Sequence, residues 1–291
     1  MNHAEALAAA WPNGIAAHTL RRIEDAIKIG TSLRYYFFRG QSRVFEWLLP
    51  IVHRAPFSQT PRENIEFRAA QRFRLRARSF APKVPEWGDH LSWLLMMQHY
   101  GVPTRLLDWT TSILVALYFA VAEPNAEPGE VWCMHPSVLN WHSNRQICGP
   151  DDPPIKYLAA EVFLEPKQLP GLAESLNVKS PPTLPLALIP AFEFPRMAAQ
   201  MSRFTIHPSG DGASMIEFLL RTEQYLVRYR VPAEYKLGLK RDLASLGISH
   251  DTLYQRLGSL ARTIREEILE EDFELIDPPQ FEAKSEPPPN G

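Results

Sequence analysis

A short stretch in the first half of the chain concentrates side chains that can do chemistry. Residues 98–112 read QHYGVPTRLLDWTTS and lie between two apolar segments. A structural turn rarely needs so many hydrogen-bonding side chains, whereas a binding site does, because a substrate must meet several donors and acceptors in fixed positions. A second patch, with the sequence FFRGQS, covers residues 37–42. We expect the two patches together to form the functional site.

Arg39 is the first candidate for a charged contact with a ligand. It ends an aromatic run and precedes Gly40, a residue that lets either another backbone segment or a ligand come close. A guanidinium in this place can form a fork of hydrogen bonds to a phosphate or a carboxylate. The alternative is an internal ion pair, for example with Asp108. Asp108 could accept a hydrogen bond from a ribose hydroxyl, act as a base, or pair with Arg39 or Arg105, and a buried pair is the commoner role.

The remaining residues of the long patch also have two interpretations each. Tyr100 and Trp109 could form aromatic walls around a flat ring, or they could belong to the core. Thr110 and Ser112 could cap a helix, and hydroxyls at a helix N-terminus also bind anionic or ribose groups. His99 is a candidate general base, although a hydrogen-bonded structural histidine is the commoner case.

The hydrophobic periodicity predicts the elements that position these patches. We expect residues 98–112 to be a turn, because Gly101 ends one helix and Pro103 prevents its continuation. The expected helices cover residues 16–29, 62–79, 90–100, a span from about 110–112 to before Pro124, 233–246 and 251–270. The expected strands cover residues 35–39, 130–134, 200–207 and 224–231, with further candidates at 159–164 and 184–189. This order is typical of an α+β domain with a mixed or antiparallel central sheet and flanking helices.

Composition excludes several classes of protein. The formal net charge of -2 provides no overall field that favours nucleic acid or a membrane. Cys133 and Cys148 match neither a disulfide framework nor a metal site, so we expect reduced thiols, a cytoplasmic location and no bound metal. The longest apolar run, residues 113–122, has about ten residues, and a membrane span needs about 20. The common glycine-rich motifs for dinucleotides and nucleoside triphosphates do not occur.

The expected helix at residues 62–79 is locally basic on a nearly neutral chain. It could contact the phosphates of RNA or DNA. The alternative is a solvated face with ion pairs to Glu63 and Glu66. The arginines concerned are Arg62, Arg68, Arg72, Arg74, Arg76 and Arg78.

Both patches resemble one known family. Residues 38–41, residues 98–112 and Ala116 to Ala120 are similar to the FRG domain, which is named for its Phe-Arg-Gly triplet. Later pieces that resemble the family are Arg196 to Gln200 with Phe204, and Lys236 before a helix that ends at Gly247-Ile248. One departure is Leu253-Tyr254-Gln255, where the family often has a Phe-Pro pair.

The resemblance extends over roughly residues 30–270 and implies three segments. These are an N-terminal helical segment at residues 1–29, an FRG domain at residues 30–276, and a disordered Pro-rich tail at residues 277–291.

The order of motifs is also similar to the Arg…Ser-Thr-Ser…Glu layout of ADP-ribosyltransferases. In that fold the Arg holds the phosphates and ribose of NAD, the hydroxyl turn places the nicotinamide ribose, and a Glu on a later strand stabilises the oxocarbenium-like sugar. By this resemblance Arg39, the segment 110–112 and Gln200 take the three roles. Gln200 departs from the pattern, because an amide supplies no charge to the developing cation. Glu193 could substitute, but Pro195 intervenes.

The resemblance therefore implies an NAD-binding protein that transfers ADP-ribose to a protein or nucleic acid, as a bacterial toxin or phage-defence effector in the cytoplasm. The expected catalytic residues are Arg39, Gln200 and Ser112. The expected NAD-binding residues are Arg39, Gln41, Tyr100, Thr104, Arg105, Asp108, Trp109, Thr110, Ser112 and Tyr118. Two alternatives remain open: a non-catalytic module that binds a ligand or nucleic acid on the same fold, and a hydrolase that uses His99 and Asp108.

Overall fold

The computed structural model describes residues 17–45, 48–54, 57, 62–123, 126–144, 151–191, 194–209, 216, 225–255 and 262. Within these residues the backbone is organised around one seven-stranded mixed sheet, with the order β1-β7-β4-β2-β3-β6-β5. β1 is parallel to β7, and every other neighbouring pair is antiparallel. The strands are β1 (Ala17–Thr19), β2 (Phe37–Gln41), β3 (Leu106–Thr110), β4 (Gly129–Met134), β5 (Leu186–Leu188), β6 (Ser202–Ile206) and β7 (Leu226–Val231).

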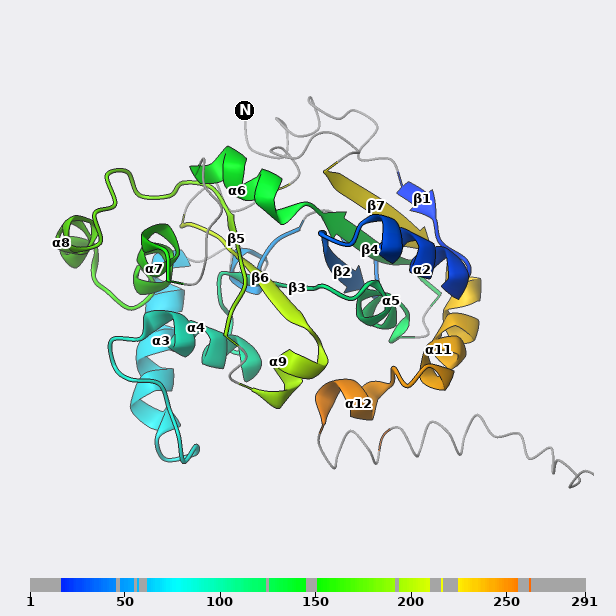
Figure 1. Cartoon of the computed structure of the whole chain (residues 1–291). Coiled ribbons are helices and arrows are strands. Elements are labelled where there is room, and N and C mark those ends of the chain that lie inside the picture. The colour runs from blue at the N-terminus through cyan, green and yellow to red at the C-terminus, as the bar shows by residue number, and fades with distance from the viewer. Residues whose placement is uncertain are drawn as a thin grey trace, which may run out of the picture.

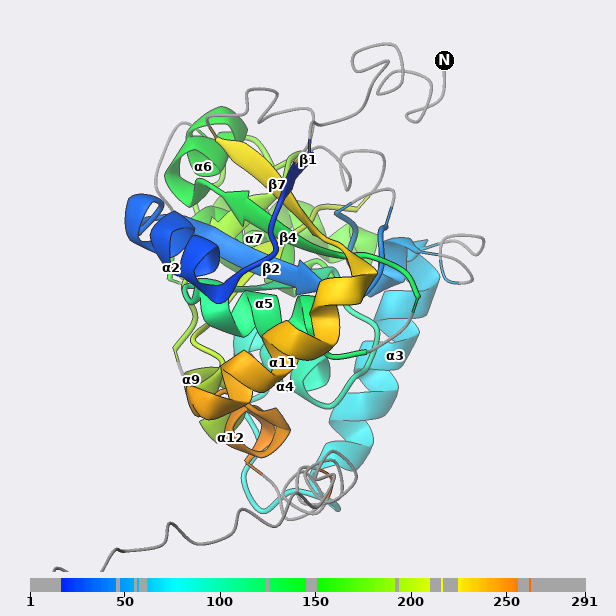
Figure 2. The ribbon, with the colours of Figure 1, turned by 90° about the vertical axis from the view of Figure 1, so that its right-hand side faces the viewer.

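Helices lie on both sides of this sheet (Figure 1, Figure 2). Their bounds are α2 (Ile23–Ser32), α3 (Arg62–Ala77), α4 (His90–His99), α5 (Ile113–Val121), α6 (Pro136–Asn144), α7 (Pro153–Ala160), α8 (Leu169–Ser175), α9 (Pro195–Ala199), α11 (Lys236–Ser245) and α12 (His250–Tyr254), with short 3-10 helices η1 (Ile51–His53), η3 (Pro166–Gln168) and η5 (Ala233–Tyr235). α5 packs on β2 and β4 and is itself covered by α2 and α11, whereas α4 packs against β3 and α7 against β6. The fold is thus α+β, with a mixed sheet flanked by helices, as the sequence predicts.

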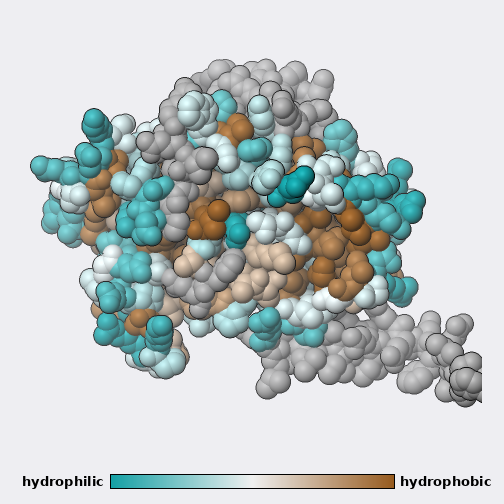
Figure 3. Space-filling model, in the orientation of Figure 1, coloured by the Kyte–Doolittle hydropathy of each residue, from teal (hydrophilic) through white to brown (hydrophobic). Residues whose placement is uncertain are grey.

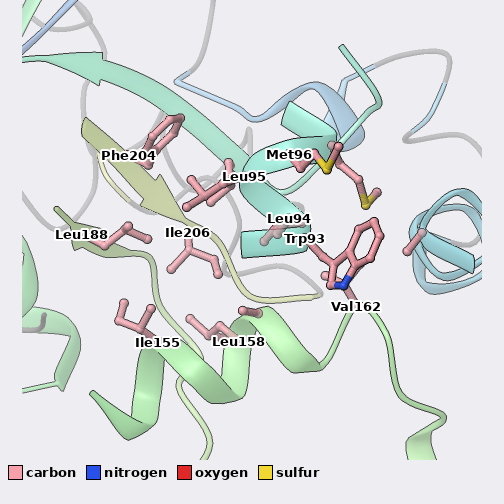
Figure 4. Close-up of a cluster of buried hydrophobic side chains, with 14 of the residues drawn as sticks. Trp93, Leu94, Leu95, Met96, Ile155, Leu158, Val162, Leu188, Phe204 and Ile206 are labelled. Carbon is pink, nitrogen blue, oxygen red and sulfur yellow. The ribbon is translucent and has the colours of Figure 1, made fainter. Parts of the chain in front are cut away.

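Side-chain alternation along the strands divides the core between the two sheet faces. Phe38 points toward α5, while its neighbour Phe37 belongs to a cluster on the opposite face. At the other end of the sheet, Leu106 and Ile206 pack under α4 and α7, and Figure 4 shows this cluster around Trp93. α5 is apolar nearly all round, and a hydrophobic surface lies over it in Figure 3.

The sheet is weakly joined between β2 and β3. These strands are paired only at Phe38 and Thr110, whereas β2 and β4 are paired along the whole of β2. Gly40 lies directly against the backbone of α5, and a Cβ at this position would overlap the carbonyl oxygen of Ala116. The two strands therefore diverge at the point where the Phe-Arg-Gly triplet meets α5.

Most predicted elements are confirmed within a few residues, including the helices at 62–79, 90–100 and 233–246. The N-cap at Ser112 is confirmed as well, because its Oγ accepts a hydrogen bond from the Val115 N–H. The predicted helix at 251–270 is described only as α12 and at residues 255 and 262, and the tail at 277–291 and Cys148 lie outside the described residues.

Three local predictions were wrong. The stretch 98–112 is not only a turn, because β3 occupies residues 106–110 and pairs with β6 along its length. The predicted helix at 16–29 begins only at Ile23, since residues 17–19 form β1 beside β7. The candidate strand at 159–164 is the end of α7 and the turn that follows it.

No helix among the described residues is long and apolar enough to cross a bilayer.

Candidate functional site

A pocket of about 250 Å³ opens where β2 and β3 diverge. We call it the split pocket. It draws residues from both halves of the sheet and from α4, α5, α9 and α12. The lining residues are Phe38, Arg39, Gly40, Gln98, Asp108, Trp109, Thr110, Phe119, Arg196, Gln200, Ser202 and Tyr254. The two patches that the sequence marks as chemical therefore meet here, although nearly sixty residues separate them along the chain.

Arg39 lies at this divergence and makes few hydrogen bonds with the described part of the protein. Its Nη1 donates a hydrogen bond to the main-chain carbonyl oxygen of Asp108 at 2.8 Å, and its buried Nε has no hydrogen-bond partner among the described residues. Burial lowers the pKa of Arg39 to about 10, against the opposing effect of Asp108 and with a further contribution from Arg54. The side chain stays protonated at neutral pH, and its contact with Asp108 is to the main chain rather than a carboxylate–guanidinium pair.

A short hydrogen-bond chain orients the carboxylate of Asp108. Gln98 Nε2 donates to Asp108 Oδ2 at 2.7 Å. The hydroxyl of Thr104, which is fully buried, donates in turn to Gln98 Oε1. Thr104 is thus not in the split pocket but acts on it through Gln98.

The hydroxyl residues of the turn after β3 have separate places. Thr110 lines the split pocket, and its Oγ1 accepts a hydrogen bond from the Ser112 N–H at 3.0 Å. Ser112 caps α5 and does not line the pocket. Of the two, only Thr110 is placed to contact a ligand there.

Gln200 lines the split pocket but does not lie on a strand. It is the C-terminal cap of α9, and Met201 with φ 47° separates it from β6. Its Nε2 points toward the carbonyl oxygen of Leu253 at 3.4 Å. The predicted position of Gln200 at the start of a strand was therefore wrong by two residues. Glu193 lies outside the described residues.

The other predicted ligand contacts lie away from the pocket or only touch it. Trp109 lines it, but its indole Nε1 donates to Thr205 Oγ1 at 3.2 Å in the core. Tyr118 is buried with its hydroxyl 3.2 Å from His250 Nδ1. Gln41 is buried beside Glu130 of β4, and Tyr100 is 53% exposed on the side of α4 that faces α3.

Arg105 belongs to a structural ion pair. It is 2% exposed, donates to Glu66 at 2.6 Å, and also donates to Glu161. Burial opposes its charge, but Glu66 and then Glu161 outweigh burial and raise the pKa of Arg105. Arg105 therefore pairs with Glu66 and Glu161 and not with Asp108, and this expected NAD contact is not among the residues that line the split pocket.

Several pocket residues were not identified as ligand contacts from the sequence. They are Phe38, Gly40, Gln98, Phe119, Arg196, Ser202 and Tyr254. Phe119 and Tyr254 read as ordinary apolar positions of helices, because nothing local distinguishes them from core residues. Arg196 had one available signal, the resemblance of residues 196–200 to a family element. Its guanidinium lies 5.2 Å from the centre of the Tyr254 ring, near enough for a cation–π contact.

The charges around the split pocket favour an anionic ligand. Arg39 and Arg196 line it, and Arg54 is close enough to act on both Arg39 and Asp108. Asp108 provides the carboxylate among the lining residues. Guanidinium groups beside aromatic rings, hydroxyls and amides suit a ligand with phosphates, a sugar and a flat ring.

Comparison with known proteins agrees with the Phe-Arg-Gly patch. Residues 34–128 match the family model of the FRG domain, whereas searches of curated proteins and of solved structures gave no significant match. The matched residues run from just before β2 to just before β4, so they include Arg39, Gln98, Asp108 and Thr110 but not Gln200. The segment that matches the FRG domain therefore supplies the β2 and β3 sides of the split pocket.

Proposed function

We propose that the split pocket binds NAD and that the protein transfers the ADP-ribose part of NAD to a macromolecular acceptor. The observation that carries this proposal is the state of Arg39. Among the described residues, this buried cation has one hydrogen bond, to a carbonyl oxygen, and it lines the pocket with its Nε unpartnered. A phosphate oxygen is the natural acceptor for such a group, because guanidinium and phosphate form charge-assisted hydrogen bonds.

The size of the pocket indicates which part of NAD it holds. Its volume of about 250 Å³ is just below the roughly 300–1,000 Å³ of pockets for whole drug-sized ligands. We assign it to the nicotinamide ribose and the adjoining phosphate, with the adenosine end on the surface outside. Thr110 and Gln200 are then placed to bind ribose hydroxyls, and Phe119 or Tyr254 to contact the nicotinamide ring.

The reaction that we propose is loss of nicotinamide with transfer of the sugar. The bond between the nicotinamide nitrogen and ribose C1′ breaks, and its electron pair leaves with nicotinamide. A nucleophilic atom of the acceptor then bonds to C1′ and loses its proton. Exposed arginines on α3 and directly after it support a nucleic-acid acceptor, because they could contact its phosphates. They are Arg68, Arg72, Arg76 and Arg78. We also propose, from the resemblance to the FRG domain, that the protein acts as a toxin or phage-defence effector in the cytoplasm.

The test is the release of nicotinamide from NAD by the full-length protein, together with transfer of labelled ADP-ribose to RNA, DNA or cell protein. We expect release by the wild type and none by Arg39→Ala. Arg34→Ala is the matched control, because Arg34 is exposed and outside the pocket. Equal release by Arg39→Ala and Arg34→Ala would contradict the proposal.

The amide at residue 200 favours a second candidate, a module that binds NAD or a related nucleotide without turnover. Gln200→Glu distinguishes the two, since it supplies the carboxylate that transferases carry. A wild type that binds NAD without releasing nicotinamide, and a variant that gains release, would identify a non-catalytic module on this fold.

A further inference from the structure

Asp108 is held by hydrogen bonds at its side chain and at its main chain. Gln98 donates to the carboxylate oxygen Oδ2 at 2.7 Å, and Arg39 donates to the main-chain carbonyl oxygen at 2.8 Å. Among the described residues, Oδ1 has no hydrogen-bond partner, and the side chain is exposed to the split pocket. One carboxylate oxygen is therefore used for positioning, and the other is available to a ligand.

The orientation of Gln98 is set by a buried hydroxyl. Thr104 Oγ1 accepts from the Leu106 N–H at 3.2 Å and donates its own proton to Gln98 Oε1. Because the Oε1 side of the amide faces Thr104, the Nε2 side must face Asp108. The sequence Thr104–Gln98–Asp108 is thus a directed chain that ends at the pocket.

Asp108 also lines the pocket that we assign to the reacting sugar. Asp108 and Thr110 alternate on β3 and so point to the same face of the sheet, the face that carries α5. Arg39 and Asp108 both line the split pocket, so one ligand bound there can contact both the guanidinium and the carboxylate. Gln200, by contrast, is uncharged and directed toward Leu253.

We propose that Asp108 is the catalytic carboxylate of the split pocket, and that Gln98 and Thr104 are its positioning residues. This inference rests on the proposed NAD reaction. As the bond from C1′ to nicotinamide breaks, the charge of Asp108 stabilises the cationic sugar. When the acceptor bonds to C1′, Asp108 takes the proton that the acceptor loses and passes it to water. Gln200 contributes a hydrogen bond to ribose but no charge.

The first test separates binding from turnover with Asp108→Asn in the full-length protein. Calorimetry with NAD measures binding, and nicotinamide release measures turnover. We expect a Kd within about threefold of the wild type and a release rate about 10²–10³-fold lower, the usual effect of losing one preorganised electrostatic group. Asp151→Asn removes an exposed carboxylate from a surface pair with Lys156, outside the split pocket, and is the matched control.

The second test examines the positioning chain through residue 104. Thr104→Val keeps the shape but removes the hydroxyl, so we expect a lower release rate with an unchanged Kd for NAD. Thr104→Ser restores the hydroxyl and should restore the rate. If Thr104 were purely structural, Thr104→Val would lose thermal stability without a fall in release rate that is separate from the Kd for NAD.

The outcomes distinguish this inference from the function on which it rests. A wild type that releases nicotinamide while Asp108→Asn and Asp151→Asn release it equally fast would overturn the role of Asp108 and leave the proposed function intact. Loss of NAD binding in Asp108→Asn would also overturn it, because the carboxylate would then serve binding. A wild type that binds no NAD would overturn both.

Discussion

Arg39 and Arg105 are both buried arginines from patches that the sequence marks as chemical, yet their surroundings are opposite. Arg105 is bound by Glu66 and Glu161, and its Nη2 also donates to Ser209 Oγ at 2.9 Å. Arg39 has a single hydrogen bond to a carbonyl oxygen and no carboxylate partner within ion-pair distance among the described residues. The pKa of Arg105 is raised, and that of Arg39 is lowered to about 10.

The difference shows how to tell a structural cation from a binding cation. A buried guanidinium whose donors are taken up by carboxylates and other protein acceptors has nothing left for a ligand, and its removal leaves buried carboxylates unpaired. A buried guanidinium with unused donors at the wall of a pocket is incomplete without an anion. Residue type and sequence context alone do not separate the two, because the partners of Arg105 come from α3 and from the end of α7.

The largest expected effect comes from breaking the satisfied arginine. Arg105→Ala leaves Glu66 buried without its cation, so the free energy of unfolding should fall by about 3–5 kcal/mol. Urea denaturation followed by circular dichroism measures this loss. A double variant, Arg105→Met with Glu66→Leu, should recover much of the stability, because it removes both buried charges. An unchanged free energy of unfolding in Arg105→Ala would contradict the structural role of Arg105, and with it the contrast between Arg105 and Arg39.

A smaller effect is expected at Gly40, the neighbour of Arg39. Its Cβ would overlap the Ala116 carbonyl oxygen, so Gly40→Ala should lower the free energy of unfolding by about 1–3 kcal/mol through overpacking. Gly88→Ala is the control, since no atom lies within 4 Å of a Cβ there. Equal stability of the two variants would mean that β2 can move away from α5, and the glycine of the triplet would then have no structural role.

The smallest expected effect is a change of NAD affinity with pH. Only the protonated guanidinium of Arg39 binds phosphate strongly, and its pKa is lowered to about 10. The Kd for NAD should therefore be constant from neutral pH to about 9 and then increase as the pH rises through about 10. Calorimetry at a series of pH values measures this change. A Kd that stays constant beyond pH 11, in protein that is still folded, would assign phosphate binding to another group.

Local patterns were sufficient for much of the fold. α3, α4, the cap at Ser112 and β2 follow from periodicity, capping residues and aromatic runs within a few positions. β3 was missed because Leu106, Leu107 and Trp109 are buried on both faces of the sheet, so the segment shows no alternation, and Asp108 made it look like a loop. Local sequence patterns do not report tertiary packing. They could not predict the partners of Arg105, or that Arg196 and Tyr254 line the pocket.

The central claim is that Arg39 is held ready for the phosphate of NAD, and calorimetric titration of NAD tests it most directly. Wild-type protein, Arg39→Ala and the control Arg34→Ala should be compared after each is shown to be folded. We predict binding by the wild type and by Arg34→Ala, and a Kd at least about tenfold higher for Arg39→Ala, as expected for the loss of hydrogen bonds from a charged group. No heat at millimolar NAD in any of the folded proteins, or equal binding by all three, would contradict the account.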